Sequence, residues 1–317
     1  MDIINDIRER AKADLKTIVF PRSSDERIIK AAQFLKNKKL ANPILIQNEK
    51  VGRLPKDSAV IDPVADENLK KYAHSFYEHR KHKGISEADA IDIIKDPLFY
   101  GAAMVAAGDA DGCVAGSVST TGDVLRAAIQ TIGLKPGSNV VSSVFLMSFD
   151  DGRGFTYGDC AVVPYPNAEQ LATIAMDSAQ THQKVTGVVP KVAMLSFSTK
   201  GSAEHERIDL VRNALDIINS HNLNYPIDGE LQFDAAIVPD VAKRKAPNSE
   251  VAGQANVFIF PNLDAGNIAY KITERLAGAT ATGPIIQGLA KPMMDLSRGC
   301  SWEDIVNTAC VCSLMSS

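Results

Sequence analysis

The sequence predicts an α/β protein, either of two domains or of one large α/β unit. Short runs of β-branched residues alternate with amphipathic helical segments almost to the end of the chain, which is the pattern of a parallel sheet covered by helices. The 317 residues are too many for one ordinary hydrophobic core. Their composition, 45% hydrophobic and 23% charged, is typical of a globular protein.

In the first half of the chain, the element boundaries are marked by helix-capping residues. Asp25 and Glu26 suit the first turn of a helix, Gly84 suits a helix C-terminus, and Asp96-Pro97 suits a helix start. We expect strands at 17–21, 43–47, 111–117 and 140–149, and helices at 24–40, 67–83, 86–95, 97–107 and 123–132.

In the second half, residues 150–154 (DDGRG) separate the apolar strand 140–149 from a strand at 155–163, which predicts an antiparallel hairpin. We then expect helices at 169–185, 206–220 and 266–276, and strands at 192–197, 233–238, 257–260 and 283–287. A domain change falls near residue 150. We expect the second domain to pack against the first across a cleft, with functional loops at the ends of strands.

Several classes of protein are excluded or disfavoured. A net charge of −4 argues against nucleic acid as a partner, and no apolar run is long enough to span a bilayer. The N-terminal residues lack an apolar signal region, and the five cysteines lack metal-ligand spacing, so we expect a cytoplasmic protein without a metal site. The GxGxxG, P-loop, nucleophile-elbow and HExxH motifs are absent.

The stretch from Gly283 to Asp304 reads as a buried strand, a loop and a polar cluster that opens the last helix. The cluster combines a hydroxyl, a guanidinium, a thiol and two carboxylates near a helix N-terminus, which suits an anionic substrate that exchanges a proton. Ser301 and Asp304 also nearly match a capping box, so Asp304 has a structural explanation as well. Cys300 lacks a neighbouring histidine and is interpreted as a buried thiol.

Two other segments are candidates for anion binding. The loop Ser117-Val-Ser-Thr-Thr-Gly122 lies between a strand and a helix that carries Arg126, so its hydroxyls and N–H groups could bind phosphate. Plain N-capping by Thr121 or Asp123 is the alternative. The basic run 80–84 ends a helix, where a solvated cationic end is the default; Arg80 is its best functional candidate.

Taken together, these segments resemble the phosphate acetyl/butyryltransferase family over essentially the whole chain. The resemblance is carried by YEHRKHKG (77–84), DGCVAGSVSTTGDVLRAAIQ (111–130), LSFSTKGSA (195–203), residues 228–272 and GPIIQGLAKPMMDLSRGCSWEDIVNTA (283–309). It implies two three-layer α/β/α domains with a cleft between them, similar to isocitrate- and isopropylmalate-type dehydrogenases, in a homodimer. The first domain would comprise residues 1–147 and 291–317, and the inserted second domain residues 148–290.

The resemblance also implies a reaction and its residues. The reaction is the reversible transfer of an acetyl group between acetyl phosphate and coenzyme A, with no permanently bound cofactor. Ser297, Arg298 and Asp304 would be catalytic. Substrate binding would involve Arg80, Arg126 and the loop hydroxyls, which belong to Ser117, Ser119, Thr120 and Thr121. Which residues hold the coenzyme A nucleotide is not implied.

The expected mechanism is direct attack of the coenzyme A thiol in a ternary complex, with Asp304 as a partly desolvated base. Met293-Met294, Ala127 and Trp302 depart from the family pattern and are expected to flank the site, where they bear on acyl-chain preference. The alternatives are a phosphate butyryltransferase and a non-catalytic domain that binds acetyl-CoA as a regulator. A dehydrogenase is disfavoured because a nicotinamide fingerprint is missing.

Overall fold

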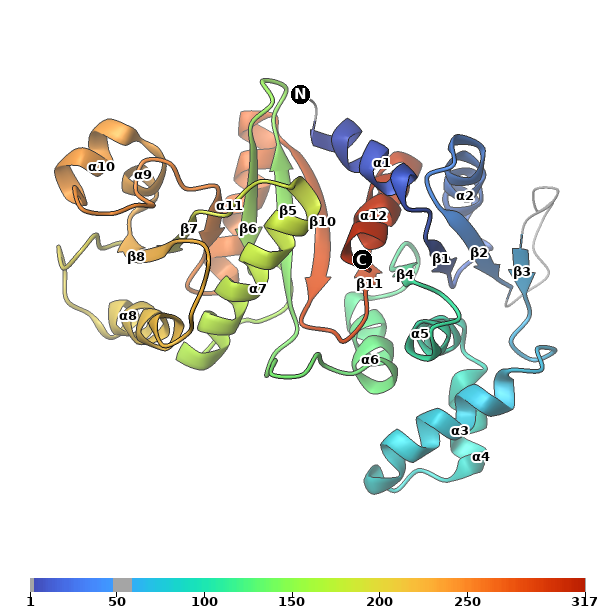
Figure 1. Ribbon diagram of the computed structural model, residues 1–317. Coiled ribbons are helices and arrows are strands. Elements are labelled where there is room, and N and C mark those ends of the chain that lie inside the picture. Colours follow the sequence, from blue (N-terminus) through green and yellow to red (C-terminus); the bar gives the residue numbers. More distant parts are fainter. Residues whose placement is uncertain (1–2, 48–58, 317) are drawn as a thin grey trace. The chain divides into compact units, whose positions relative to one another are not determined.

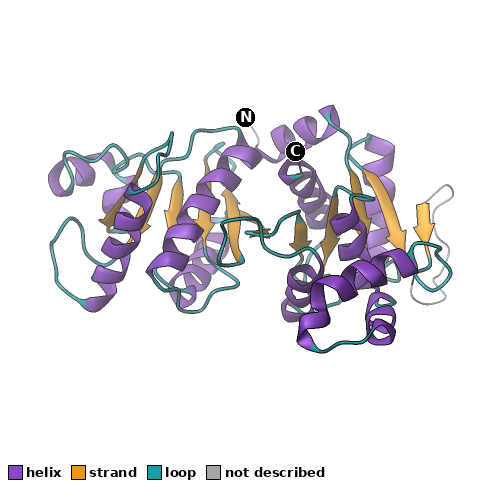
Figure 2. Cartoon of the chain, turned by 60° about the horizontal axis from the view of Figure 1, so that its bottom comes forward, coloured by secondary structure: helices purple, strands orange, loops and turns teal. Residues whose placement is uncertain are grey.

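The computed structural model describes residues 3–47 and 59–316, which form two compact α/β units (Figures 1 and 2). The split unit comprises residues 4–136 and 289–317, and the central unit comprises residues 1–3 and 137–288. The boundary expected after residue 147 would place the strand at 142–148 in the first domain. That strand instead pairs on both sides with strands of the central unit, so the division falls before it. The expected cleft between the domains stays a prediction.

The split unit is built on a five-stranded parallel sheet. Its strands are β1 (Thr17–Phe20), β2 (Asn42–Ile46), β3 (Ala59–Ile61), β4 (Gly112–Ala115) and β11 (Met293–Asp295), in the order β11-β4-β1-β2-β3. Each pair of neighbouring strands in this sheet is parallel. The chain therefore leaves the sheet at the same edge after β1, β4 and β11.

Helices cover both faces of this sheet (Figure 1). One face carries α2 (Glu26–Lys38) and α12 (Trp302–Met315), with α1 (Ile3–Ala13) joined to α12 by a hydrogen bond from Arg8 Nε to Asn307 Oδ1 (3.0 Å). The other face carries α5 (Pro97–Ala107) and α6 (Thr121–Thr131), over which lie α3 (Leu69–Arg80) and α4 (Glu87–Ile94). Gly84 and Asp96 cap helices as expected, whereas Asp25, expected in the first turn of α2, is its N-cap residue.

A topological switch point lies between β1 and β4 of this sheet. After β1 the chain passes to α2 on one face, whereas after β4 it passes to α6 on the opposite face. In open parallel sheets, such a divergence leaves a crevice outside the carboxyl ends of the two strands, where ligands commonly bind. The loops after β1, β4 and β11 are therefore the place in the split unit to look for a site.

The central unit has a six-stranded mixed sheet. Its strands are β5 (Ser142–Ser148), β6 (Gly154–Gly158), β7 (Val192–Leu195), β8 (Ile227–Leu231), β9 (Val257–Ile259) and β10 (Thr280–Gln287), in the order β10-β5-β6-β9-β7-β8. The predicted hairpin of β5 and β6 is confirmed, although β6 ends at Gly158 rather than at residue 163.

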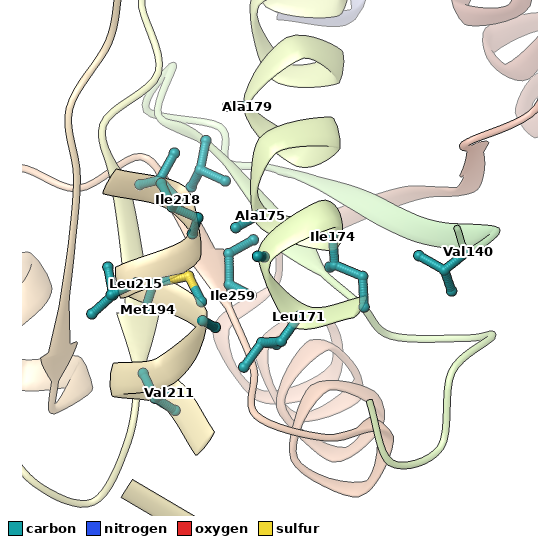
Figure 3. Packing of buried hydrophobic residues seen from close by; sticks show 14 residues of the cluster. Val140, Leu171, Ile174, Ala175, Ala179, Met194, Val211, Leu215, Ile218 and Ile259 are labelled. Carbon is teal, nitrogen blue, oxygen red and sulfur yellow. The ribbon is translucent and has the colours of Figure 1, made fainter. Parts of the chain in front are cut away.

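Helices also cover both faces of the central sheet. On one face, α7 (Ala168–Thr186) and α8 (Glu206–Asn219) bury a cluster that includes Leu171, Leu215 and Met194 (Figure 3). The other face packs against α9 (Phe233–Ile237), α10 (Pro239–Lys245) and α11 (Leu263–Ala277). The predicted α/β class and its layers are thus confirmed.

One expected strand was wrong, and several elements of the structure were not expected. The strand expected at 233–238 is the short helix α9, and the strand of this region is β8, which ends at Leu231. Ala235 and Ala236 favour helix over strand, and Pro239 then starts α10. β3, β11, α1 and α10 are present although no strand or helix was expected at their positions. Among the described residues, no helix is long and apolar enough to cross a membrane.

Candidate active site

Three loops meet at the carboxyl edge of the sheet in the split unit. They follow Phe20 of β1, Ala115 of β4 and Asp295 of β11, and they lead into α2, α6 and α12. The loops after β4 and β11 contain five of the nine predicted site residues, and two more, Thr121 and Asp304, lie in the first turns of the helices that these loops enter.

Arg27, in the first turn of α2, ties these loops together. Its Nη1 donates hydrogen bonds to the backbone oxygens of Arg298 (2.9 Å) and Cys300 (2.8 Å), and its Nη2 donates to the backbone oxygen of Ser117 (2.9 Å). Its remaining donors bind the Asp25 carboxylate at 2.9–3.1 Å. The guanidinium is therefore fully engaged within the protein, so Arg27 positions the loops and is not a free cation.

Asp25 is the carboxylate that holds Arg27 in this position. Its side chain is only 7% exposed, and it also accepts the N–H of Arg27 as the N-cap of α2. Burial by itself raises the pKa of Asp25, but hydrogen bonds from Arg27 and Ser117 outweigh it and leave the pKa below its usual value. The pair therefore stays ionised at neutral pH, with its hydrogen bonds satisfied.

The loop after β4 presents the N-terminus of α6. Thr120 is the N-cap residue and accepts the N–H of Asp123 (3.2 Å), so the predicted capping by Thr121 or Asp123 was wrong. The first N–H groups of α6 lack intrahelical partners, as at any helix start. Ser117 is buried, and the hydroxyl oxygen of Ser119 is buried without a hydrogen-bond partner among the described residues.

Arg126 and a pocket lie beside this helix start. Arg126 Nη1 binds Asp123 Oδ1 at 2.9 Å, and its side chain remains exposed. The pocket has a volume of about 560 Å³ and is lined by Ser119, Thr120 and Arg126 together with Arg22 and Phe99. It thus combines hydroxyl and guanidinium groups with an apolar wall within one unit.

The loop after β11 presents the polar cluster. Ser297 and Arg298 are exposed, and the Arg298 side chain has no hydrogen-bond or ion-pair partner among the described residues. The capping box is confirmed: Asp304 N–H donates to Ser301 Oγ (3.1 Å), and Asp304 Oδ2 accepts from Ser301 N–H (2.8 Å). Asp304 is exposed, so the expected partial desolvation is not present.

Cys300 is buried, with 8% of its surface exposed. Burial raises the pKa of its thiol, and the nearby Arg27 charge only partly offsets this. A thiol with a raised pKa is a poor nucleophile at neutral pH. Its environment therefore matches the interpretation of Cys300 as a packing residue.

Arg80 stands apart from the other predicted site residues. It is half-buried at the end of α3, and the described part of the chain contains no hydrogen bond or ion pair to its side chain. α3 packs against α6, which also carries Arg126. Arg80 therefore belongs to the same unit as the other site residues, but within the described part of the chain no hydrogen bond or ion pair joins it to them.

The residues that depart from the family pattern do not flank the site as expected. Met293 and Met294 are fully buried in β11, and Ala127 is fully buried in α6. Trp302 packs edge-on against Phe34 of α2, and Lys30 Nζ lies 4.2 Å from its ring centroid. These side chains pack against the interior of the unit or against α2. Their departure from the family pattern therefore does not indicate a change in acyl-chain preference.

Sequence reasoning missed three contributors to this site: Asp25, Arg27 and Asp295. Asp25 was attributed only to a helix start and Arg27 was not singled out, because their partners in the other loops are 90 or more residues away in the sequence. Asp295 was missed because the strand that it ends was not expected. The one feature of the sequence that could have indicated a role for Asp295 is its position directly before the polar cluster.

Among the described residues, no group of three or more His, Cys, Asp or Glu side chains could hold a metal ion.

The fold is of the α/β class, and the hydroxyl and guanidinium groups at one edge of its sheet are of the kind that bind anions. The sequence profile described as phosphate acetyl/butaryl transferase matches residues 2–313, and the chain belongs to this family. The expected family and the expected acyltransferase class are thereby confirmed.

Relatives and solved structures agree with this assignment. The chain is 48% identical to the phosphate acetyltransferase of Acetivibrio thermocellus, covering 100% of this chain and 98% of the relative. It is also 48% identical to that of Thermoanaerobacterium thermosaccharolyticum, covering 97% of each. A phosphotransacetylase structure from Streptococcus pyogenes superposes with a TM-score of 0.93 at 41% identity, covering 99% of this chain and 98% of that one. These similarities support phosphate acetyltransferase as the function and favour neither alternative.

The dehydrogenase-like architecture is confirmed at the level of fold alone. A structure from Salmonella typhimurium, described as a 4-hydroxythreonine-4-phosphate dehydrogenase, superposes with a TM-score of 0.52 at 11% identity, covering 96% of this chain and 99% of that one. Identity this low says nothing about shared chemistry.

Proposed function

We propose that this protein is a phosphate acetyltransferase that transfers the acetyl group directly between acetyl phosphate and the thiol of coenzyme A. One observation carries the proposal: Arg27 fixes the hydroxyl-rich loop at the N-terminus of α6 to the loop that carries Ser297, Arg298 and Asp304. An anion site and a proton-accepting carboxylate are thereby held on one sheet edge. The sequence similarity to phosphate acetyltransferases supports the same reaction.

The phosphoryl group of acetyl phosphate binds at the start of α6 in this proposal. The helix N-terminus, the hydroxyls of Ser119 and Thr120, and Arg126 provide donors for its oxygens. Ser119 is a suitable donor because its hydroxyl oxygen is buried and has no partner among the residues that the structure describes. Ser117 has a different task, since its backbone oxygen is held by Arg27.

Arg298 stabilises the negative charge that develops during transfer. Its guanidinium is exposed and unpaired within the described residues, whereas its backbone is fixed by Arg27. A tetrahedral oxyanion and the departing phosphate both need donors that are already in place before the reaction. Removing one such donor typically costs 100- to 1,000-fold in turnover, on the order of 3–4 kcal/mol.

Asp304 accepts the proton of the coenzyme A thiol, and Ser297 orients the sulfur or the carboxylate. With a thiol pKa of about 8.5, roughly a tenth is already thiolate near pH 7.5, so deprotonation alone contributes only about tenfold. Asp304 must therefore act while the thiol is held against the acyl carbon. The capping box leaves its side chain fixed by one hydrogen bond and exposed to an incoming thiol.

The acyl group passes without a covalent enzyme intermediate in this proposal. Cys300 would be the obvious acceptor of the acetyl group, but it is buried and the pKa of its thiol is raised.

Coenzyme A is a substrate and not a bound cofactor in this proposal. Arg80 is assigned to substrate binding by the family resemblance alone. A homodimer and a cytoplasmic location complete the proposal; the five buried, free cysteines support a reducing compartment.

The function is tested by measuring thioester formation from coenzyme A with acetyl phosphate and, separately, with butyryl phosphate. We expect acetyl-CoA and phosphate to form in equal amounts, with a higher kcat/KM for acetyl phosphate. Arg298→Met is expected to lose at least about 100-fold in turnover, whereas Arg153→Met, at an exposed arginine of the central unit, serves as the matched control. A higher kcat/KM for butyryl phosphate would identify a butyryltransferase, and no thioester with either substrate would refute the proposal.

A further inference from the structure

Asp295 is a buried carboxyl group directly behind the proposed anion site. It is the last residue of β11, opposite Ala115 of β4, and only 1% of its surface is exposed. The hydroxyl of Thr121 donates to Asp295 Oδ2 over 2.6 Å. Thr121 is itself exposed at the start of α6. Asp295 is thus linked by one hydrogen bond to the first residue of α6, next in the chain to Thr120 of the proposed phosphate site.

The surroundings of Asp295 are closed and leave one oxygen unsatisfied. Gly116 has φ +103°, and a Cβ there would collide with Asp295 Oδ1 and with the backbone of Leu296. Oδ1 is buried and has no hydrogen-bond partner among the described residues. An ionised carboxylate with an unpaired buried oxygen is costly, whereas the carbonyl oxygen of a neutral acid is much less so. The environment therefore favours the neutral form of Asp295.

The hydrogen bond between Thr121 and Asp295 contains too few protons to serve both Asp295 and a bound anion when Asp295 is ionised. A threonine hydroxyl has one proton to donate, and an ionised carboxylate can only accept. When Asp295 is ionised, the Thr121 proton is therefore used inside the protein. When Asp295 carries a proton on Oδ2, that proton can be donated to Thr121 Oγ1, and the Thr121 proton becomes available to a bound anion.

Burial raises the pKa of Asp295 to about 6, although the hydrogen bond from Thr121 acts in the opposite direction. No charged group is among the causes of this shift. The titratable or charged side chains on the elements packed against β11, and in the loop after it, are Cys113, Asp123, Arg126, Arg298, Cys300, Glu303, Asp304, Cys310 and Cys312.

We infer that Asp295 is a positioning residue whose protonation releases the Thr121 hydroxyl to donate to the phosphoryl group of the substrate. This inference rests on the proposed function, because it takes the start of α6 as the phosphate site. The proton comes from the solvent and returns to it, so no bond other than O–H is made or broken. Thr121 is then a donor to the substrate only in the protonated state of Asp295.

Anion binding and proton uptake are coupled in this arrangement. A bound anion repels an ionised Asp295 and accepts the proton of Thr121, so it raises the pKa of Asp295 in the complex. By linkage, protonation of Asp295 must strengthen anion binding by the same factor. Affinity should therefore fall as pH rises above about 6, by at most about tenfold per pH unit, until the pKa of the complex is passed.

The inference is tested with sulfate, a tetrahedral dianion that does not titrate near neutral pH. Calorimetric titrations at pH 7 in two buffers of different ionisation enthalpy give the number of protons taken up per sulfate bound, and a pH series gives the affinity. The wild-type protein should take up a fraction of a proton and bind less tightly at pH 8 than at pH 6. Asp295→Asn should abolish the uptake, flatten the pH dependence and bind sulfate at pH 8 at least as tightly, because the amide can donate to Thr121.

Two further variants separate the hydrogen-bond switch from simple charge repulsion. Asp123→Asn is the matched control: hydrogen bonding to Thr120 and pairing with Arg126 lower the pKa of Asp123, so its removal should change affinity equally at every pH and leave proton uptake intact. In a Thr121→Val background, the gain from Asp295→Asn at pH 8 should be largely lost, which a double-mutant cycle measures.

The outcomes distinguish this inference from the proposed function. Failure of sulfate to bind wild-type protein in competition with acetyl phosphate would overturn the anion site at the start of α6 and with it the role of Asp295, whereas the proposed function is refuted separately, by the absence of thioester formation. Competitive binding without proton uptake, or with uptake unchanged in Asp295→Asn, would overturn only the role of Asp295. Since the wild-type measurement needs no variant, the inference is open to refutation even if Asp295→Asn does not fold.

Discussion

Replacing Arg27 with methionine removes the group that ties the three loops of the site together. The change deletes three hydrogen bonds from a charged donor to the backbone oxygens of residues 117, 298 and 300. Each such bond contributes about 1.5–3 kcal/mol when buried. The change also leaves Asp25, with a 7% exposed side chain, without its cation. Arg27 is about one-third exposed, so we expect a total loss of roughly 3–5 kcal/mol in the free energy of unfolding.

Activity should fall further than stability alone explains. Once the loops are no longer tied, Arg298 and the start of α6 lose their relative positions, and a displacement of about 1 Å commonly costs 100-fold in rate. We expect Arg27→Met to lower kcat by at least about 100-fold under conditions where the variant is folded. Arg27→Lys keeps the charge but not the planar fork, so its loss should be intermediate.

Urea denaturation and steady-state kinetics measure both effects. Arg153→Met is the matched control, because Arg153 pairs with exposed Asp151 and stacks on Phe149 in the central unit. It should change stability by less than about 1 kcal/mol and leave kinetics unaltered. An Arg27→Met variant with wild-type stability and turnover would refute the view that Arg27 holds the loops in place.

Three other substitutions test separate parts of the account. Asp304→Asn should lower kcat by about 100- to 10,000-fold with little change in KM; an unchanged kcat would leave Asp304 with only its capping role. Cys300→Ala should retain most activity, and loss of a labelled acetyl adduct together with activity would contradict this. Asp295→Asn should be more stable than wild type at pH 8 by up to about 3 kcal/mol, because the raised pKa of Asp295 destabilises its ionised form; urea midpoints should converge towards pH 4. Equal midpoints at both pH values would argue against a buried, ionised Asp295.

The elements of the fold that were predictable are those set by local signals. Gly84 at a positive φ, Asp96 before Pro97, and the Ser301–Asp304 capping box each act within a few residues, and each is present where expected. The alternation of strands and helices also gave the α/β class, because parallel strands require crossover helices.

The elements that were missed depend on contacts between distant segments. β11 has only three residues and follows Lys291-Pro292, so its sequence resembles a loop; pairing with β4 makes it a strand. α9 looked like a strand because residues 235–238 form a contiguous apolar run, but a single helical turn buries Ala235 and Ala236 equally well. Neither pattern can be decided from periodicity over so few residues.

The site was predictable in its polar residues but not in what organises them. The hydroxyl-rich loop and the cluster after β11 each carry their chemistry in consecutive residues, so both could be found in the sequence. The three contacts of Arg27 join residues 90, 271 and 273 positions apart, and nothing local in the sequence indicates them. The bond from Thr121 to Asp295 spans 174 positions and was missed for the same reason.

Isotope exchange between labelled inorganic phosphate and acetyl phosphate tests most directly the claim that the acetyl group passes straight from phosphate to the coenzyme A thiol. Direct transfer requires coenzyme A to accept the acetyl group before phosphate can leave. We therefore predict that label enters acetyl phosphate when coenzyme A is present and that none enters when it is omitted. Exchange at a comparable rate without coenzyme A would show that the enzyme itself carries the acetyl group, and would contradict the mechanism.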